Sequence, residues 1–358
     1  MAGGVLLAGA LLVIEAAPDL PGSAATPGPP HPADSTAPCE VVPHPITLSA
    51  PLDQASAEVS GLAWHGDTLV VLPQYPSRMA PEGTRRLYGL PREALLQALA
   101  DTTAAPIAPT PIQLTVNGPR TDSAAHQGFE ALAFVGSRAY LLMERARPEG
   151  GMDGGLFPGT VSLERQHVTV RAPDARLLPA QAALRNMSYE ALTTVGDTVL
   201  ALFEANGARV NPEPRAHRFD AGGQPAGTVS FPTLEYRLTD ATAADARGRF
   251  WVMNYFFPGE RGILQPAPDS LAMRFGRGRS HRTTDVVERL VEYQYTPAGI
   301  RRTEAPPIQL ALDADTGRNW EGLARLNDGF LLATDQFPTT LLAYVPAPHA
   351  ASCLPDTP

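Results

Sequence analysis

The distribution of hydrophobic and polar residues repeats along the chain. In each copy, a small or acidic residue precedes a pair of small and apolar residues, a turn and a nearly continuous apolar run. The five copies are Ser60–Leu72, Glu130–Glu144, Glu190–Glu204, Asp240–Asn254 and Glu321–Asp335. Each copy predicts a β-hairpin, and the continuous apolarity of its second strand predicts burial on both faces.

Further strands follow the hairpins and complete the repeated unit. After the second copy, Gly159–Glu164 and His167–Arg171 have the pattern of an outer pair of strands. Four strands per unit, with inner strands buried on both sides, are typical of a β-propeller blade. We therefore predict an all-β fold, a single closed β-propeller of four-stranded blades. The repeat indicates five blades, and a sixth would require a copy too degenerate to recognise.

The last unit lacks one strand, and the N-terminal part of the chain offers a replacement. The segment Pro45–Ser49 is predicted to complete this blade and so close the ring. The intervals between copies also leave room for insertions, of which Phe257–Thr284 is the longest, and Pro91–Ala100 is the best helix candidate. The 37 prolines and 31 glycines fit many short strands joined by tight turns.

The two ends of the chain differ in composition from the patterned region. Residues 1–38 comprise an apolar run, Gly3–Ile14, and a stretch rich in Pro, Gly and Ala. This run is shorter than a membrane span and resembles a secretory signal, which predicts a secreted or periplasmic protein that is not an integral membrane protein once processed. A disordered tail with an apolar tip is the alternative. The propeller domain is assigned to residues 39–353, and residues 354–358 form a tail.

The only two cysteines bracket the patterned region. In a closed ring the chain ends meet, so we predict a disulfide between Cys39 and Cys353, which requires an oxidising compartment. Two unrelated free thiols are the alternative. The formal net charge of -9 argues against nucleic acid as a partner, because a polyanion needs a contiguous basic face. We expect a monomer.

Four acidic residues occupy the same place in their copies and are predicted to converge on the channel axis: Glu130, Glu190, Asp240 and Glu321. Two carboxylates about 7 Å apart repel by roughly 2 kcal/mol at an effective dielectric constant near 20, so a cation or a bound proton would relieve such a ring. Hard oxygen ligands suit a divalent cation, and Ca²⁺ is the ion we predict. The alternative is that each acid caps backbone amides of the adjoining blade.

A second tier of polar residues stands fourteen positions after the first in each of these copies: Glu144, Glu204, Asn254 and Asp335. Because a hairpin doubles back, both tiers are predicted to line one mouth of the channel. Strand-end residues that face solvent are the alternative.

Other signatures of catalysis are absent from the sequence, including a Gly-x-Ser-x-Gly elbow and His-Glu-x-x-His. His126 is a candidate general base because it precedes Glu130 closely, with simple exposure as the alternative. Arginines that follow the second-tier strands are candidates for holding an anionic group, with surface solvation as the alternative: Arg145, Arg209 and Arg215.

Four stretches carry a resemblance to a known family. Asn319–Asp335 resembles the last blade of the phytase-like, or esterase-like phytase, β-propeller family. Gly128–Leu132 with Tyr140–Glu144 looks like the acidic start and Glu-ended strand of that family, and Asp245–Trp251 looks like its Gly-turn-Phe-Trp hairpin.

The resemblance spans residues 59–344 and implies a propeller that uses calcium at its channel. The chain departs from the family pattern at two acidic positions, since it has Ser60 in the first copy and Asn254 after the Phe-Trp strand. Two functions follow as hypotheses. One is a metal-dependent hydrolase of phosphoesters, esters or lactones, and the other is a non-catalytic propeller that binds a small molecule or a protein at the channel face.

Overall fold

The computed structural model describes residues 40–118, 126–147, 151–313, 317–335 and 340–347. The apolar N-terminal segment and both Cys39 and Cys353 lie outside these ranges. The export signal and the disulfide therefore stay predictions. Within the described ranges, none of the helices has both the length and the apolar character that a membrane span requires.

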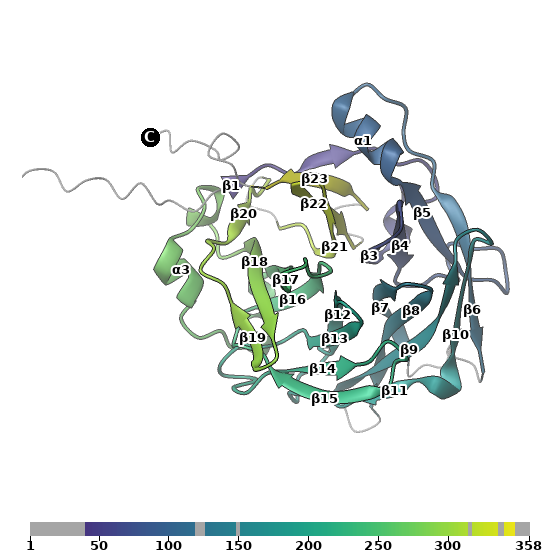
Figure 1. Ribbon diagram of the computed structural model, residues 1–358. Coiled ribbons are helices and arrows are strands. Elements are labelled where there is room, and N and C mark those ends of the chain that lie inside the picture. The colour runs from purple at the N-terminus through teal and green to yellow at the C-terminus, as the bar shows by residue number, and fades with distance from the viewer. Residues whose placement is uncertain (1–39, 119–125, 148–150, 314–316, 336–339, 348–358) are drawn as a thin grey trace, which may run out of the picture. The chain divides into compact units, whose positions relative to one another are not determined.

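The described residues form five blades around a central channel (Figure 1). Blade I contains β3 (Val59–His65), β4 (Thr68–Pro73), β5 (Arg86–Pro91) and β6 (Thr110–Asn117). Blade II contains β7 (His126–Val135), β8 (Arg138–Ala146), β9 (Met152–Ser162) and β10 (His167–Arg171), with β11 (Arg176–Leu178) beside β9. Blade III contains β12 (Tyr189–Val195), β13 (Thr198–Phe203), β14 (Arg215–Phe219) and β15 (Pro225–Ser230).

Blades IV and V share the N-terminal segment. Blade IV contains β16 (Arg237–Ala241), β17 (Arg249–Phe256) and β18 (Val287–Thr296), with β19 (Gly299–Arg302), β20 (Ile308–Leu310) and β1 (Glu40–Val41) at its edge. Blade V contains β21 (Trp320–Leu326), β22 (Gly329–Thr334), β23 (Leu342–Pro346) and β2 (His44–Ile46). The short helices are η1 (Ala55–Ala57), α1 (Arg92–Ala100), η2 (Ala172–Asp174), η3 (Pro258–Glu260), α2 (Arg261–Leu264), α3 (Ser270–Phe275) and η4 (Ser280–Arg282).

The N-terminal strand closes the ring as predicted. β2 pairs with β23 in antiparallel fashion, with Pro45 opposite Ala343, and so supplies the missing strand of blade V. The innermost strands contact one another in the order β3, β7, β12, β16, β21 and back to β3. The predicted single closed β-propeller is therefore confirmed, with five blades. The predicted helix is also present, as α1.

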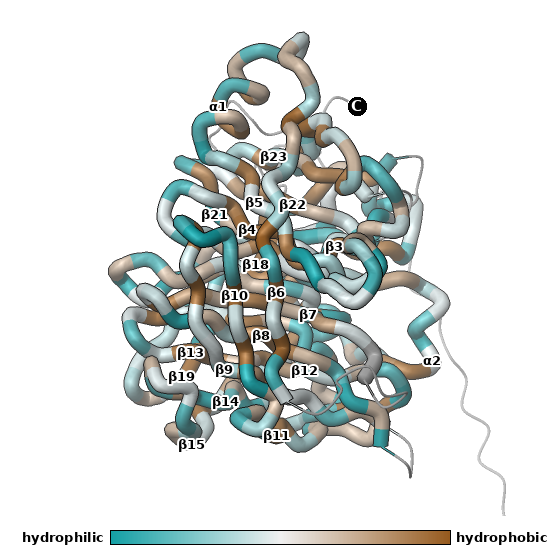
Figure 2. The backbone as a smooth tube through the Cα atoms, turned by 90° about the vertical axis from the view of Figure 1, so that its right-hand side faces the viewer, coloured by the Kyte–Doolittle hydropathy of each residue, from teal (hydrophilic) through white to brown (hydrophobic). Residues whose placement is uncertain are grey.

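One feature of the sheets was not predicted. β6 of blade I pairs in parallel with β10 of blade II, which joins the two blades into one nine-stranded sheet. Apolar side chains of adjacent blades form the core between them, for example Leu192 and Phe203 of blade III against Leu142 of blade II. Figure 2 shows the hydrophobic stretches along the strands and the hydrophilic ones mainly in the loops.

A ring of apolar side chains narrows the channel. It contains one residue from each innermost strand: Leu62, Leu132, Leu192, Ala241 and Leu323. All five are buried. The ring and the residues that follow it line a cavity of about 90 Å³. This apolar ring separates the polar start of the innermost strands from their turn ends.

Candidate functional site

Each innermost strand contains a β-bulge two residues before its member of the apolar ring, which defines equivalent positions in the five blades. The residue at the bulge is Ser60, Glu130, Glu190, Thr239 or Glu321 in blades I to V. The structure therefore places three of the predicted acids in one register, in blades II, III and V. In blade IV the expected register is wrong by one residue, because Asp240 follows the bulge.

This shift gives Asp240 a structural role. Its carboxylate accepts hydrogen bonds from the backbone N–H of Ala241 at 2.8 Å and from that of Leu323, in blade V, at 2.6 Å. Asp240 is buried, so these bonds join two blades in the core. For Asp240, the structure therefore agrees with the alternative that the acid caps backbone amides. The other three acids of the first tier occupy equivalent positions.

The second tier shows the same shift. In each blade, the residue just before the bulge pairs with a residue on the second strand of the hairpin. In blades II, III and V the second-tier acid comes one position after that paired residue: Glu144, Glu204 and Asp335. In blade IV, Asn254 is itself the paired residue, opposite Leu238. The blade IV residue equivalent to Glu204 is Tyr255. Asn254 is fully buried and donates hydrogen bonds to the backbone carbonyls of Glu235 and Arg237, both at 2.9 Å.

Arg237, at the start of β16, is a central residue that the sequence pattern did not reveal. Its guanidinium hydrogen-bonds to Glu204, lies 3.2 Å from both carboxylate oxygens of Glu190, and lies 3.4 Å from Glu321. A fourth carboxylate, that of Glu260 in η3, is 3.6 Å away. The available signal was an arginine three residues before Asp240, the acid that begins the fourth copy of the repeat.

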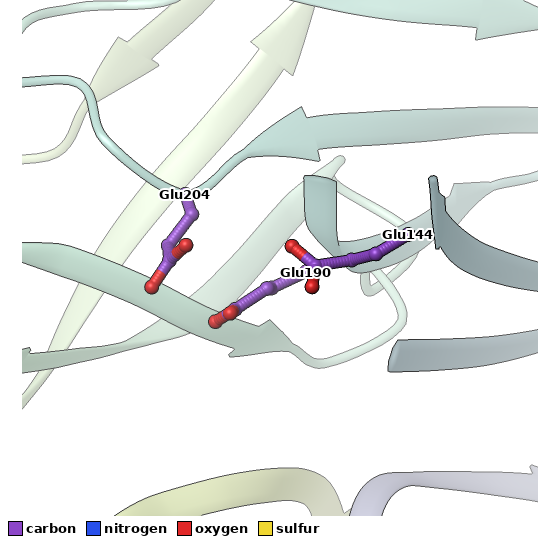
Figure 3. A group of neighbouring side chains, drawn as sticks. All are labelled: Glu144, Glu190 and Glu204. Carbon is purple, nitrogen blue, oxygen red and sulfur yellow. The ribbon is translucent and has the colours of Figure 1, made fainter. Parts of the chain in front are cut away.

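Three glutamates from blades II and III meet beside Arg237. Glu144, Glu190 and Glu204 each offer an oxygen, and these oxygens lie within 4.8 Å of one another (Figure 3). All three residues are buried. Among the described residues, Glu144 Oε1 and Glu204 Oε2 have no hydrogen-bond partner. Buried carboxylate oxygens without a partner are costly, and both residues belong to the group of acids whose oxygens lie close together.

The cluster extends to Glu130 and Glu321, each held by an amide side chain. Gln74 Nε2 donates to both oxygens of Glu130 at 3.2 and 3.3 Å, and Asn319 Nδ2 donates to Glu321 at 2.6 Å. Gly128 makes room for the first of these contacts. Its φ of 138° favours glycine, and a Cβ there would come within 2.5 Å of the Gln74 side chain.

Burial and mutual repulsion favour the protonated forms of these acids. Burial raises the pKa of Glu204 to about 7, with Arg237 opposing the shift. Burial, with the charge of Glu190, raises the pKa of Glu144 to about 8. The pKa values of Glu130, Glu190 and Glu321 also lie well above their ordinary value, with burial as the largest cause. The single positive charge of Arg237 therefore does not offset the effects of burial and repulsion on these acids.

The remaining candidates are His126 and three exposed arginines, Arg145, Arg209 and Arg215. The backbone of His126 pairs with Arg145 between β7 and β8, and the side chain of His126 is outside the described set. The exposed Arg209 donates to the carbonyl of Pro266 at 3.3 Å. The exposed Arg215 pairs with Glu213 at 3.8 Å. The roles predicted for His126 and the arginines remain untested.

No protein-family model matches the chain, and no curated protein sequence matches it. Solved structures similar to the chain include the catalytic domain of a GH62 α-L-arabinofuranosidase from Coprinopsis cinerea, with a TM-score of 0.46 and 8% identity over 86% of this chain and 97% of that chain. A GH43 endo-arabinanase from Bacillus licheniformis has a TM-score of 0.42 and 12% identity, over 84% of this chain and 95% of that chain. A glucose dehydrogenase has a TM-score of 0.44 and 13% identity, over 83% and 98%. The fold assignment rests on the strand pairing above, and these similarities do not bear on activity.

Proposed function

We propose that the space between Glu144, Glu190 and Glu204 binds one divalent cation, with Ca²⁺ as the first candidate. The observation that carries this proposal is the pair of buried, unpartnered oxygens, Glu144 Oε1 and Glu204 Oε2. The residues fit such an ion, because all three donors are hard carboxylate oxygens and converge from two blades. A bound dication would also supply positive charge that Arg237 alone does not.

We further propose that the chain is a metal-dependent hydrolase of phosphoesters, carboxylic esters or lactones at this mouth. A divalent ion supplies Lewis acidity and lowers the pKa of water. Glu130 is the candidate proton carrier, because its raised pKa keeps a proton available and Gln74 fixes its orientation. The apolar ring below narrows the channel, which limits the access of water to the carboxylates from that side.

Calorimetry tests the cation site directly. Titration with Ca²⁺, Mg²⁺ and Mn²⁺ is expected to show saturable binding at millimolar concentration or below. Glu144→Gln should weaken that binding at least about tenfold, because it removes one charged ligand. Glu164→Gln is the matched control, since Glu164 is exposed and follows β9 away from the cluster. Absence of binding by all three ions would overturn the proposal.

Turnover separates the two hypotheses on function. A chelator-treated sample is assayed against an aryl phosphate, an aryl ester and a lactone, before and after each ion is restored. Loss and ion-specific recovery of turnover on at least one substrate supports the hydrolase. Ion binding without turnover on any of them would favour the non-catalytic propeller, which would use the same mouth to hold a small molecule or a protein.

A further inference from the structure

We infer that Arg237 is a built-in counter-ion that takes the place of a second cation at the mouth. The inference has two parts. Arg237 holds the cluster together when no ion is bound, and it restricts the site to a single ion. The second part rests on the proposed cation site, whereas the first part does not.

The surroundings of Arg237 are those of a buried cation. Its side chain is only 11% exposed, and its guanidinium lies among carboxylates from blade III, blade V and η3. Nε and NH2 are directed at Glu204 and Glu190, which are also two of the three proposed ion ligands. The guanidinium therefore contacts both oxygens of Glu190 but only one of Glu204, and it leaves Glu204 Oε2 to the ion.

The backbone of Arg237 is fixed from behind by a buried chain of polar contacts. Asn254 Nδ2 donates to the Arg237 carbonyl at 2.9 Å, and Asn254 Oδ1 accepts from Arg289 Nε at 2.8 Å. Arg289 is in turn paired with Asp269 at 2.8 Å, at the start of α3 in the long insertion. Asn254 therefore acts as a positioning residue, and the insertion contributes to the placement of Arg237.

The geometry also leaves space for one ion. In the described part of the chain, a single group of three acids brings its oxygens close enough to share a cation. Glu321 contacts the same NH2 of Arg237 as Glu190 does: its Oε1 accepts from that NH2 at 3.4 Å and from Asn319 Nδ2 at 2.6 Å. Removal of the guanidinium would free Glu190, Glu260 and Glu321 to form a second site in the space it occupies.

The test compares Arg237→Met, Arg237→Lys and the double variant Arg237→Met/Glu321→Gln with the wild-type protein, first without metal. Arg237→Met should lower the melting temperature by at least about 5 °C, because it leaves buried carboxylates unpaired. Lysine should restore part of the loss, since it keeps the charge. Removal of one repelling carboxylate in the double variant should restore another part.

The number of bound ions tests the second part. Calorimetry with Ca²⁺ should give one ion per wild-type chain and two per Arg237→Met chain, with a larger melting shift by Ca²⁺ in the variant. If Arg237→Met does not fold without metal, the double variant and Arg237→Lys provide the comparison.

Two outcomes would overturn the counter-ion role. One is a metal-free Arg237→Met protein that melts within 2 °C of the wild type, and the other is a double variant that is no more stable than Arg237→Met. Unchanged stoichiometry in the variant would overturn the restriction to one ion. A wild type that binds no ion would contradict the proposed function while the metal-free comparison still decides the counter-ion role.

Discussion

Blades III and IV carry the same sequence pattern and use it for different purposes. In blade III, the pattern places Glu190 and Glu204 in the mouth of the channel, where their carboxylates face Arg237. In blade IV, the residues at the matching positions of the sequence repeat are Asp240 and Asn254, and they hydrogen-bond to backbone groups instead. The comparison teaches that one residue of register separates a candidate ligand from a structural cap.

The shift originates in the length of the hairpin. From the bulge to the second-tier position is fourteen residues in blade III, from Glu190 to Glu204, and sixteen in blade IV, from Thr239 to Tyr255. Because of the two extra residues, the polar residues of the repeat lie one position inside the structurally equivalent positions at each end of the hairpin. The spacing between Asp240 and Asn254 therefore remains fourteen, as in the other copies. The longer turn is closed by Gly248, whose φ is 74°.

The largest expected difference between the two blades is in stability. Asp240→Ala should lower the free energy of unfolding by about 2 to 4 kcal/mol, because two buried N–H groups, those of Ala241 and Leu323, lose their acceptor. Urea denaturation of the metal-free protein measures this effect. Affinity for Ca²⁺ should change little, since Asp240 is outside the triad of candidate ligands.

Two variants make the comparison sharper. Asp240→Asn retains one oxygen acceptor and should destabilise less than alanine does. Glu204→Gln, in blade III, should do the reverse of Asp240→Ala: the metal-free protein stays as stable or gains slightly, while ion affinity falls. If Asp240→Ala reduced ion affinity as strongly as Glu204→Gln, the division of roles between the blades would be wrong.

The sequence predicted the architecture well because blade burial leaves a strong pattern. The five hairpins, the closing strand Pro45–Ser49 and the helix at Pro91–Ala100 all follow from apolar runs and turn residues, which are local signals. Glu130, Glu190 and Glu321 share a register for the same reason.

The centre of the site could not be predicted in this way. A β-bulge and a two-residue longer hairpin leave no clear mark on a hydrophobic pattern, so Asp240 and Thr239 could not be distinguished by spacing alone. Arg237 lies two residues before the bulge, and its contacts with Glu260 and Glu321 bring together parts of the chain that are distant in sequence. The pairing of β6 with β10 is likewise a contact between blades.

A further effect, spread over several pH units, is expected through the acids of blades II and III. The pKa values of Glu204 and Glu144 are raised to about 7 and about 8 from an ordinary 4.5, so the native state binds more protons than the unfolded state between these limits. The resulting stabilisation is complete below about pH 4.5 and is lost as the pH rises through 7 and 8. Without metal, the free energy of unfolding should therefore fall from pH 5 to pH 8, by up to about 1.4 kcal/mol per pH unit for each of these two groups.

Thermal melts in chelator and in Ca²⁺ across this range measure the effect. Since an ion binds the deprotonated carboxylates, its stabilising effect should grow with pH and oppose the fall. The double variant Glu144→Gln/Glu204→Gln should show a flatter dependence without metal. A wild-type protein whose metal-free stability rises between pH 5 and pH 8 would contradict the raised pKa values.

The smallest effect is expected from the exposed arginines of blade III, which contrast with the buried arginine of blade IV. The Arg215 side chain is 54% exposed and its partner Glu213 is 84% exposed, so solvent screens the pair. Arg215→Ala should therefore change the free energy of unfolding by less than about 0.5 kcal/mol, and KM for an aryl phosphate by less than about twofold. Arg209→Ala should have a similarly small effect, since the exposed Arg209 donates to a backbone carbonyl, that of Pro266, at 3.3 Å. A selective rise of KM for the phosphate, with KM for an uncharged ester unchanged, would instead show that these side chains reach an anionic substrate, and charge recognition would then extend beyond the contacts of Arg237.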